Sequence, residues 1–183
     1  MDRKKFLKIS ASGAAGVATM PLWMQACTPA SESSSSELFF KLSLAQWSLH
    51  KSFFGASLSQ GWEGMMEMMQ KDPASLFQGL NPMEFPAIAR NDYGIDAVEY
   101  VTQFYPNTSG ADDAHIKELK QRSDDAGVRN VLLMVDLEGA LGDPDEAARQ
   151  QAIENHYKWV DVGAFLGCHS IRVNAESAGS WDE

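Results

Sequence analysis

Cysteine, basic side chains and long apolar runs are all scarce in this sequence of 183 residues. Two cysteines are too few for a disulfide-stabilised scaffold. The 15 Lys and Arg residues are outnumbered by 25 Asp and Glu residues, and the net charge of −10 disfavours a nucleic-acid-binding protein. No apolar run reaches the roughly 20 residues of a transmembrane helix. With 44% hydrophobic residues, the chain is still apolar enough to fold, and its length suits one domain.

The first 38 residues differ in composition from the rest. In residues 1–27 a basic start precedes a short apolar run, which predicts a signal peptide. Arg3-Lys-Lys-Phe-Leu-Lys8 resembles the twin-arginine (Tat) motif, with Lys4 in place of the second Arg, and the surroundings of Cys27 resemble a lipidation site. The Ser-rich residues 28–38 predict a tether. We therefore expect an exported protein, periplasmic or anchored as a lipoprotein through Cys27; an ordinary signal without lipidation is the alternative.

Residues 39–183 alternate between short apolar runs and longer helical patterns, which is typical of repeated βα units. The last three predicted strands begin 35 and 38 residues apart, close to one unit of a (β/α)8 (TIM) barrel of about 250 residues. The fold class is therefore predicted as α/β, a partial (β/α)8 barrel of about four βα units; a complete doubly wound sheet is the alternative. The strands are predicted at 41–48, 95–101, 130–136 and 168–174, and helices at 82–92, 112–126 and 143–166.

Four βα units fill only half of an eight-stranded barrel. We therefore expect residues 39–183 to be the N-terminal half of a barrel, present here as a truncated chain. Alone, this half would expose the inner sheet face and an unpaired strand at each edge. Closure of a barrel by two copies of a complete four-unit chain is the alternative.

Alternation along the strands predicts which side chains face the barrel axis. Because Ile171 and Val173 suit the side covered by helices, their polar neighbours should face inward, near the carboxyl ends where barrel active sites form. Burying polar groups costs free energy unless they pair or bind a polar ligand, which indicates a site. The candidate substrate-binding residues are His50, Glu99, Asp136, Arg172 and Asn174, with Glu138 nearby.

Each candidate also has a structural alternative. For Glu99 and Arg172 the alternative is an ion pair that fills the barrel. For Asp136 it is a position in a solvated turn. His50 would be a surface residue. Several other notable side chains are predicted to pack in the core, among them Trp47, the methionines of 64–69 (alternatively a copper site), His156, Cys168 and His169.

Four segments resemble the bacterial sugar phosphate isomerase/epimerase family, the xylose isomerase-like barrels, over roughly residues 41–180. The two segments that contain the second and fourth predicted strands, the last two given below, are the most specific. They are Leu44-Ala-Gln-Trp-Ser-Leu-His50, Asn81-Pro-Met-Glu-Phe-Pro86, Tyr93-Gly-Ile-Asp-Ala-Val-Glu-Tyr100 and Leu166-Gly-Cys-His-Ser-Ile-Arg-Val-Asn174.

The resemblance implies a sugar or polyol substrate and a divalent metal, Mn²⁺, Mg²⁺ or Co²⁺, that assists proton or hydride transfer beside a sugar carbonyl. It places the catalytic residues and metal ligands on the fifth to eighth strands, so this fragment alone should bind no metal and be inactive. Glu99, Arg172 and Asn174 resemble substrate-facing residues of the family. Related apurinic endonucleases carry zinc-binding histidines where Asp136 and Asn174 stand here, which disfavours that branch and a nucleic-acid partner.

The predicted function is therefore that of an exported sugar isomerase or epimerase, a class of isomerase, represented here by the N-terminal half of the barrel. The alternative is a non-catalytic, surface-tethered barrel that binds carbohydrate.

Overall fold

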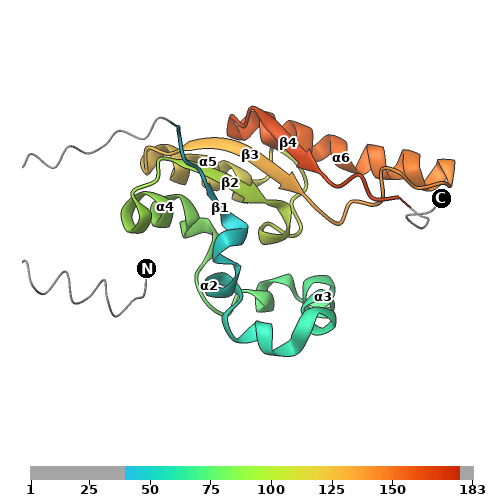
Figure 1. Cartoon of the computed structure of the whole chain (residues 1–183), viewed down its shortest axis with the longest axis horizontal. Coiled ribbons are helices and arrows are strands. Elements are labelled where there is room, and N and C mark those ends of the chain that lie inside the picture. The colour runs from blue at the N-terminus through green and yellow to red at the C-terminus, as the bar shows by residue number, and fades with distance from the viewer. Residues whose placement is uncertain (1–39, 178–183) are drawn as a thin grey trace, which may run out of the picture. The chain divides into compact units, whose positions relative to one another are not determined.

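The computed structural model describes residues 40–177 (Figure 1). The predicted signal peptide (1–27), with Cys27, and the predicted tether (28–38) lie outside the described residues. The chain divides into two units at residue 41, and everything below concerns the second unit, which begins at Leu42. Within the described part, no helix is both long and apolar enough to cross a membrane.

A parallel sheet of four strands forms the centre of the fold (Figure 1). The strands follow one another in the order of the chain, β1-β2-β3-β4, and every neighbouring pair is parallel. This order continues in one direction, as in a barrel, whereas a doubly wound sheet reverses direction partway. The α/β partial barrel is thus confirmed, and the doubly wound alternative is wrong. The strands are β1 (Leu44–Ala45), β2 (Ala97–Val101), β3 (Arg129–Val135) and β4 (Ser170–Val173).

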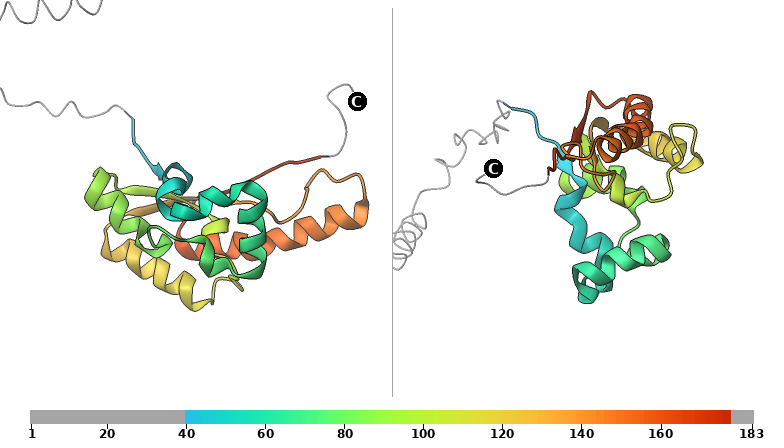
Figure 2. Two further views of the ribbon diagram at one scale, coloured as in Figure 1. Left: turned by 90° about the horizontal axis from the view of Figure 1, so that it is seen from below. Right: turned by 90° about the vertical axis from the view of Figure 1, so that its right-hand side faces the viewer.

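Three helices pack on one face of the sheet (Figure 2). They are α4 (Phe85–Tyr93), α5 (Ala114–Asp125) and α6 (Glu146–Leu166). Each of α5 and α6 begins after an aspartate whose carboxylate accepts a backbone N–H of the first turn, as expected for N-caps: Asp113 for α5 and Asp145 for α6. The predicted start of the last helix, at residue 143, is therefore early by about one turn.

The first predicted strand, 41–48, is largely wrong. Only Leu44 and Ala45 pair with β2, and the chain turns helical from Gln46. The side chain of Gln46 supplies a hydrogen-bond acceptor that a longer β1 would have supplied from its backbone: the backbone N–H of Val101 donates to Gln46 Oε1 at 3.3 Å. The segment up to α4 contains η3 (Gln46–Leu49), α2 (His50–Phe54), η4 (Gly55–Gln60), α3 (Gly61–Lys71), η5 (Pro73–Leu76) and η6 (Pro82–Glu84).

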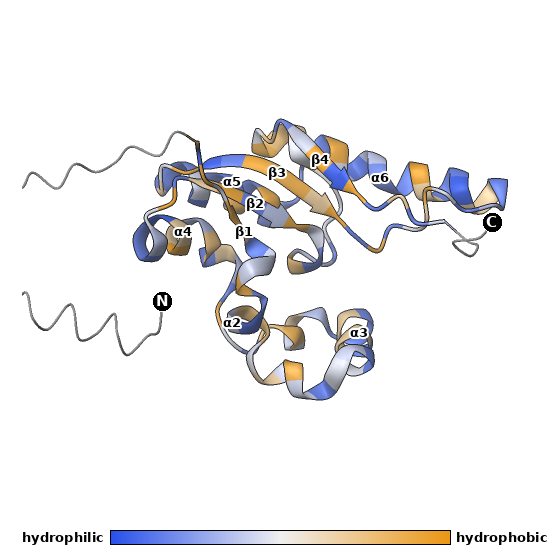
Figure 3. Cartoon of the chain, in the orientation of Figure 1, coloured by the Kyte–Doolittle hydropathy of each residue, from blue (hydrophilic) through white to orange (hydrophobic). Residues whose placement is uncertain are grey.

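The hydrophobic core joins the segment between β1 and α4 to the sheet. The Phe54 and Phe104 rings stack at 5.2 Å, and Phe53 meets the Phe85 ring edge-on at 6.1 Å. From the Met-rich helix α3, Met65 is buried in the same core cluster and Met68 and Met69 pack against it, which agrees with the packing interpretation of the methionines. Colouring by hydropathy shows an apolar β3 in the middle of the sheet (Figure 3).

The sheet stays open at both edges within the described residues, since β1 pairs only with β2 and β4 only with β3. Helix α6, which covers β3 and β4, carries large apolar side chains that remain exposed: Tyr157, Val160 and Phe165. Open strand edges and exposed large apolar side chains are features that proteins normally cover. The unpaired edge strands expected of a half barrel are thus seen within residues 40–177.

Candidate functional site

Asp136 and Asn174 meet at the carboxyl ends of the two last strands. Asp136 directly follows β3, Asn174 directly follows β4, and the side-chain amide of Asn174 donates from Nδ2 to Oδ1 of Asp136 at 2.5 Å. The backbone N–H of Asp136 donates to the hydroxyl of Thr102, at the end of β2, at 3.2 Å. Three neighbouring strand ends are thus joined by polar groups at one edge of the sheet.

Glu138 lies beside this pair and is held by helix α6. The indole Nε1–H of Trp159 donates to its Oε1 at 2.5 Å, and the ammonium of Lys158 lies 3.2 Å from the same oxygen. The intervening Leu137 adopts a φ of 65°, a left-handed conformation that is strained for a leucine. Because Trp159 is buried, Glu138 is fixed in place rather than solvated as a free loop carboxylate.

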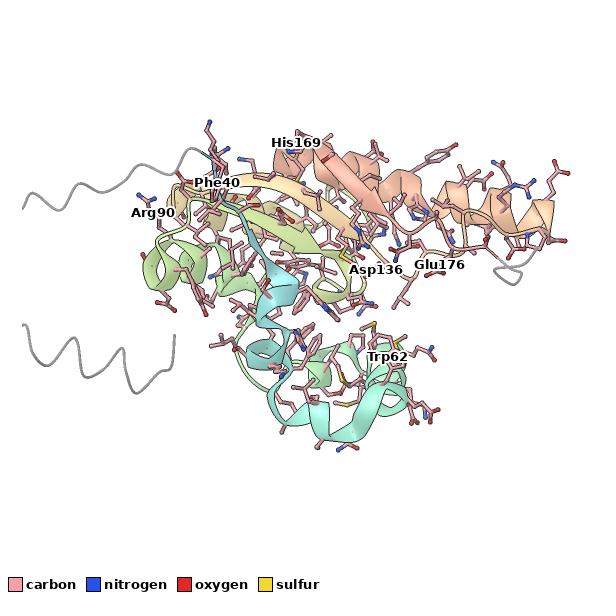
Figure 4. All side chains as sticks on the ribbon, in the orientation of Figure 1. Phe40, Trp62, Arg90, Asp136, His169 and Glu176 are labelled. Carbon is pink, nitrogen blue, oxygen red and sulfur yellow. The ribbon has the colours of Figure 1, made fainter. Side chains whose placement is uncertain are left out.

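These groups and the loop after β4 together line a small hollow. It has a volume of about 10 Å³, enough for roughly one water molecule, and is lined by Asp136, Glu138, His156, Asn174 and Glu176. Figure 4 shows Asp136 and Glu176 next to each other beyond the carboxyl ends of the strands. The arrangement offers carboxylate and amide oxygens together with one amide N–H donor, which are the groups that bind hydroxyls.

Glu99 and Arg172 are not brought together. The Ser43 hydroxyl donates to the carboxylate of Glu99, whereas Arg172 lies exposed on β4 in register with Met134. No ion pair joins Glu99 to Arg172 among residues 40–177, so the structural alternative proposed for them is wrong there. The register still places both on the face of the sheet opposite the helices, since Ile171, which alternates with Arg172, lies next to Gly163 of α6.

His50 lies apart from the Asp136–Asn174 pair, on helix α2. Its ring stacks on Trp47 at 5.3 Å, and its Nδ1–H donates to the backbone carbonyl of the same residue at 2.8 Å. The residue is half-buried, so the surface alternative is only partly right. Since the strand ends at Ala45, alternation cannot be carried as far as His50, and its proposed role in binding stays a prediction.

The remaining notable side chains are mostly structural. His156 is buried and donates to the carbonyl of Ala152 at 2.7 Å, as predicted. Cys168 packs against the core, and burial raises the pKa of its thiol to about 11. The prediction for His169 is wrong: it is exposed, because β4 begins one residue later, at Ser170.

Sequence reasoning did not single out Thr102 and missed the significance of Gln46 and Trp159. All three are buried and hold the loops at the strand ends through hydrogen bonds. Thr102 follows the strand pattern of β2 directly, and that position is the one signal that would have indicated it. For Gln46 the alternating pattern of the predicted strand 41–48 is misleading, because the observed strand ends one residue earlier, at Ala45.

The described residues do not fit a divalent metal. Across residues 40–177 no three His, Cys, Asp or Glu side chains cluster in a way that could hold an ion. At the strand ends, the carboxylates of Asp136 and Glu138 are already bound, the first by Asn174 and the second by Trp159 and Lys158. The structure therefore gives no support to a metal on these residues, whatever the family uses elsewhere.

Sequential parallel βα units with polar side chains at the carboxyl ends define the class of (β/α)8 barrel proteins. The family model described as "Xylose isomerase-like TIM barrel" matches residues 88–183, or 96 of the 183 residues. The chain therefore belongs to the xylose isomerase-like TIM barrel family, in agreement with the resemblance noted from the sequence. No curated protein matches the chain.

Proposed function

We propose that this chain forms part of a sugar isomerase or epimerase and that the Asp136–Asn174 pair binds hydroxyl groups of the substrate. The observation that carries the proposal is the hydrogen bond between these side chains at the carboxyl ends of β3 and β4. In a (β/α)8 barrel these ends form the active site. The family membership of residues 88–183 supports the same reaction class.

A sugar suits this pair chemically. Each sugar hydroxyl can both donate and accept a hydrogen bond. A carboxylate beside an amide offers an acceptor for the hydroxyl proton and an N–H donor for the hydroxyl oxygen. Asn174 keeps a second N–H and its carbonyl oxygen for a ligand, and Asp136 keeps its other oxygen. With Thr102 and Trp159 holding the loops, these groups are preorganised for binding.

Further βα units are needed to complete such a site. The unpaired edge of β4 is where the next strand of a barrel would pair. We propose that such further units supply the catalytic groups and any Mn²⁺, Mg²⁺ or Co²⁺ ligands. Residues 40–177 without them would then be inactive.

The proposal also includes export. A signal peptide over 1–27 with lipidation at Cys27 would place the protein in the periplasm or on the membrane surface. Mass spectrometry of the N-terminus of the natural protein tests it: a lipid-modified Cys27 supports the anchor, cleavage without lipid supports an ordinary signal, and an intact Met1 contradicts both.

The reaction is tested on the protein expressed from its natural gene, with a panel of neutral aldoses and ketoses in D₂O. Deuterium incorporation beside the carbonyl would indicate proton transfer, whereas conversion without deuterium would indicate hydride transfer. Asn174→Leu should raise KM by about tenfold, the effect of losing roughly 1.4 kcal/mol of hydrogen bonding. Asn91→Leu, which removes an exposed amide of α4 away from the pair, is the matched control.

The second candidate is a barrel that binds carbohydrate without turnover, and the exposed position of Arg172 on the inner sheet face is compatible with it. Binding of a sugar that is weakened by Asn174→Leu, with no conversion of any sugar, would support this candidate. Absence of both binding and conversion would contradict the two proposals together.

A further inference from the structure

A cavity of about 760 Å³ lies away from the Asp136–Asn174 pair. Its walls come from the segment 73–83 that precedes α4, from residues 104–108 after β2, and from α5 with its N-cap Asp113. It shares no lining residue with the small hollow at the ends of β3 and β4. Its size lies within the range of small-molecule sites.

The inner part of this cavity is apolar and aromatic. Phe77 and Phe104 stack with 5.8 Å between ring centres, and Met83 and Pro82 lie against the same space. The hydroxyl of Tyr105 is already engaged, because it accepts from Gln46 Nε2 at 3.0 Å and lies 3.5 Å from the Pro82 carbonyl. What Tyr105 presents to the cavity is therefore its ring.

The rim carries more negative than positive charge. Asp113 and Glu118 line it, and Arg122 is its only Lys or Arg residue. The guanidinium of Arg122 is already shared between two carboxylates, those of Glu118 at 2.8 Å and Glu84. Backbone N–H groups, including that of His115, lower the pKa of Asp113, so this carboxyl stays ionised at neutral pH. The lining thus carries two acidic residues and one basic residue, and the ring of His115, also in the lining, lies 3.5 Å from the carboxylate of Asp113. With a neutral His115, the charge of the lining is negative.

We propose that this cavity binds an organic ammonium compound, with an aromatic or aliphatic body against the rings and the positive nitrogen near Asp113 and Glu118. Aromatic faces attract organic cations, and carboxylates add to that attraction. The same charges would repel a phosphate or carboxylate. This site is separate from the proposed sugar site and takes a chemically different ligand.

Two probes of opposite charge test the proposal on the full chain. Tryptamine and indole-3-propionate carry the same ring, and their binding is measured by isothermal titration calorimetry, with two-dimensional NMR to locate the affected residues. We expect tryptamine to bind at least about tenfold more tightly, because a change of charge sign near two carboxylates is worth more than 1.4 kcal/mol at partly screened distances.

Variants separate charge from shape. Glu118→Gln should weaken tryptamine binding about threefold to tenfold, whereas Glu154→Gln, an equal charge change on α6 outside the cavity, should leave it unchanged. Ala74→Trp, at an exposed position of the lining, should block binding of both probes. Asn174→Leu should have no effect, so this result does not depend on the proposed sugar site.

Three outcomes would overturn the inference. They are no tryptamine binding at millimolar concentration, equal binding of the two indoles, and NMR shifts that spare the residues around Phe77 and Tyr105. Circular dichroism of Glu118→Gln and Ala74→Trp against the parent chain shows whether a loss of binding reflects loss of fold; Glu118→Gln keeps the size of the side chain for this reason.

Discussion

Gln46 should be among the most sensitive polar positions of the chain. It is fully buried, its Oε1 accepts from the backbone N–H of Val101 at 3.3 Å, and its Nε2 donates to the hydroxyl of Tyr105 at 3.0 Å. Gln46→Met keeps the size of the side chain but removes both hydrogen bonds. Tyr105 retains a weak partner in the Pro82 carbonyl, whereas the N–H of Val101 loses its acceptor.

A buried group without its partner costs about 1–3 kcal/mol, so Gln46→Met should lower the free energy of unfolding by roughly 2–4 kcal/mol. Urea denaturation followed by far-ultraviolet circular dichroism measures this, with an unchanged slope showing that the native fold is kept. Gln70→Met, an exposed position on α3, is the matched control and should change stability by less than about 0.5 kcal/mol. A loss at Gln46 no greater than in the control would refute the idea that its side chain continues the strand ladder.

Three further predictions concern other parts of the fold. In a Cys27→Ser background, Cys168 should react with iodoacetamide at pH 8 about two hundredfold more slowly than an ordinary thiol, because its pKa is about 11. Any contribution of this raised pKa to the free energy of unfolding should be lost as the pH rises from about 8.5 through 11. Trp159→Phe should cost about 1–3 kcal/mol in urea denaturation, since Glu138 loses its indole donor; an unchanged midpoint would contradict this. Gly79→Ala should lower the melting temperature, because its Cβ would lie 2.0 Å from the Ser52 carbonyl oxygen.

The units from β2 to β4 could be predicted from the sequence because their signals are local. The predicted strands 95–101, 130–136 and 168–174 each contain the observed strand or lie within one residue of it, and the helix predicted at 112–126 contains α5. The first unit could not be predicted in the same way. Its alternating pattern continues past Ala45, yet the backbone turns helical there because the side chain of Gln46 completes the hydrogen bonding of Val101. This contact links residues 55 positions apart, and no local pattern reports it.

The candidate site shows the same division. Asp136 and Asn174 could be predicted because each follows a strand directly, and the ends of parallel neighbours meet at one edge. Their partners Thr102 and Trp159 come from β2 and α6, and only the three-dimensional packing shows that they hold these loops. The separation of Glu99 from Arg172 is also a tertiary fact: they lie two strands apart, and within the described residues Arg172 has no carboxylate in reach. If further strands complete the barrel across the open edge of β4, Arg172 lies on the face they would enclose. A charged side chain on that face then needs a partner from the added strands or from a bound substrate.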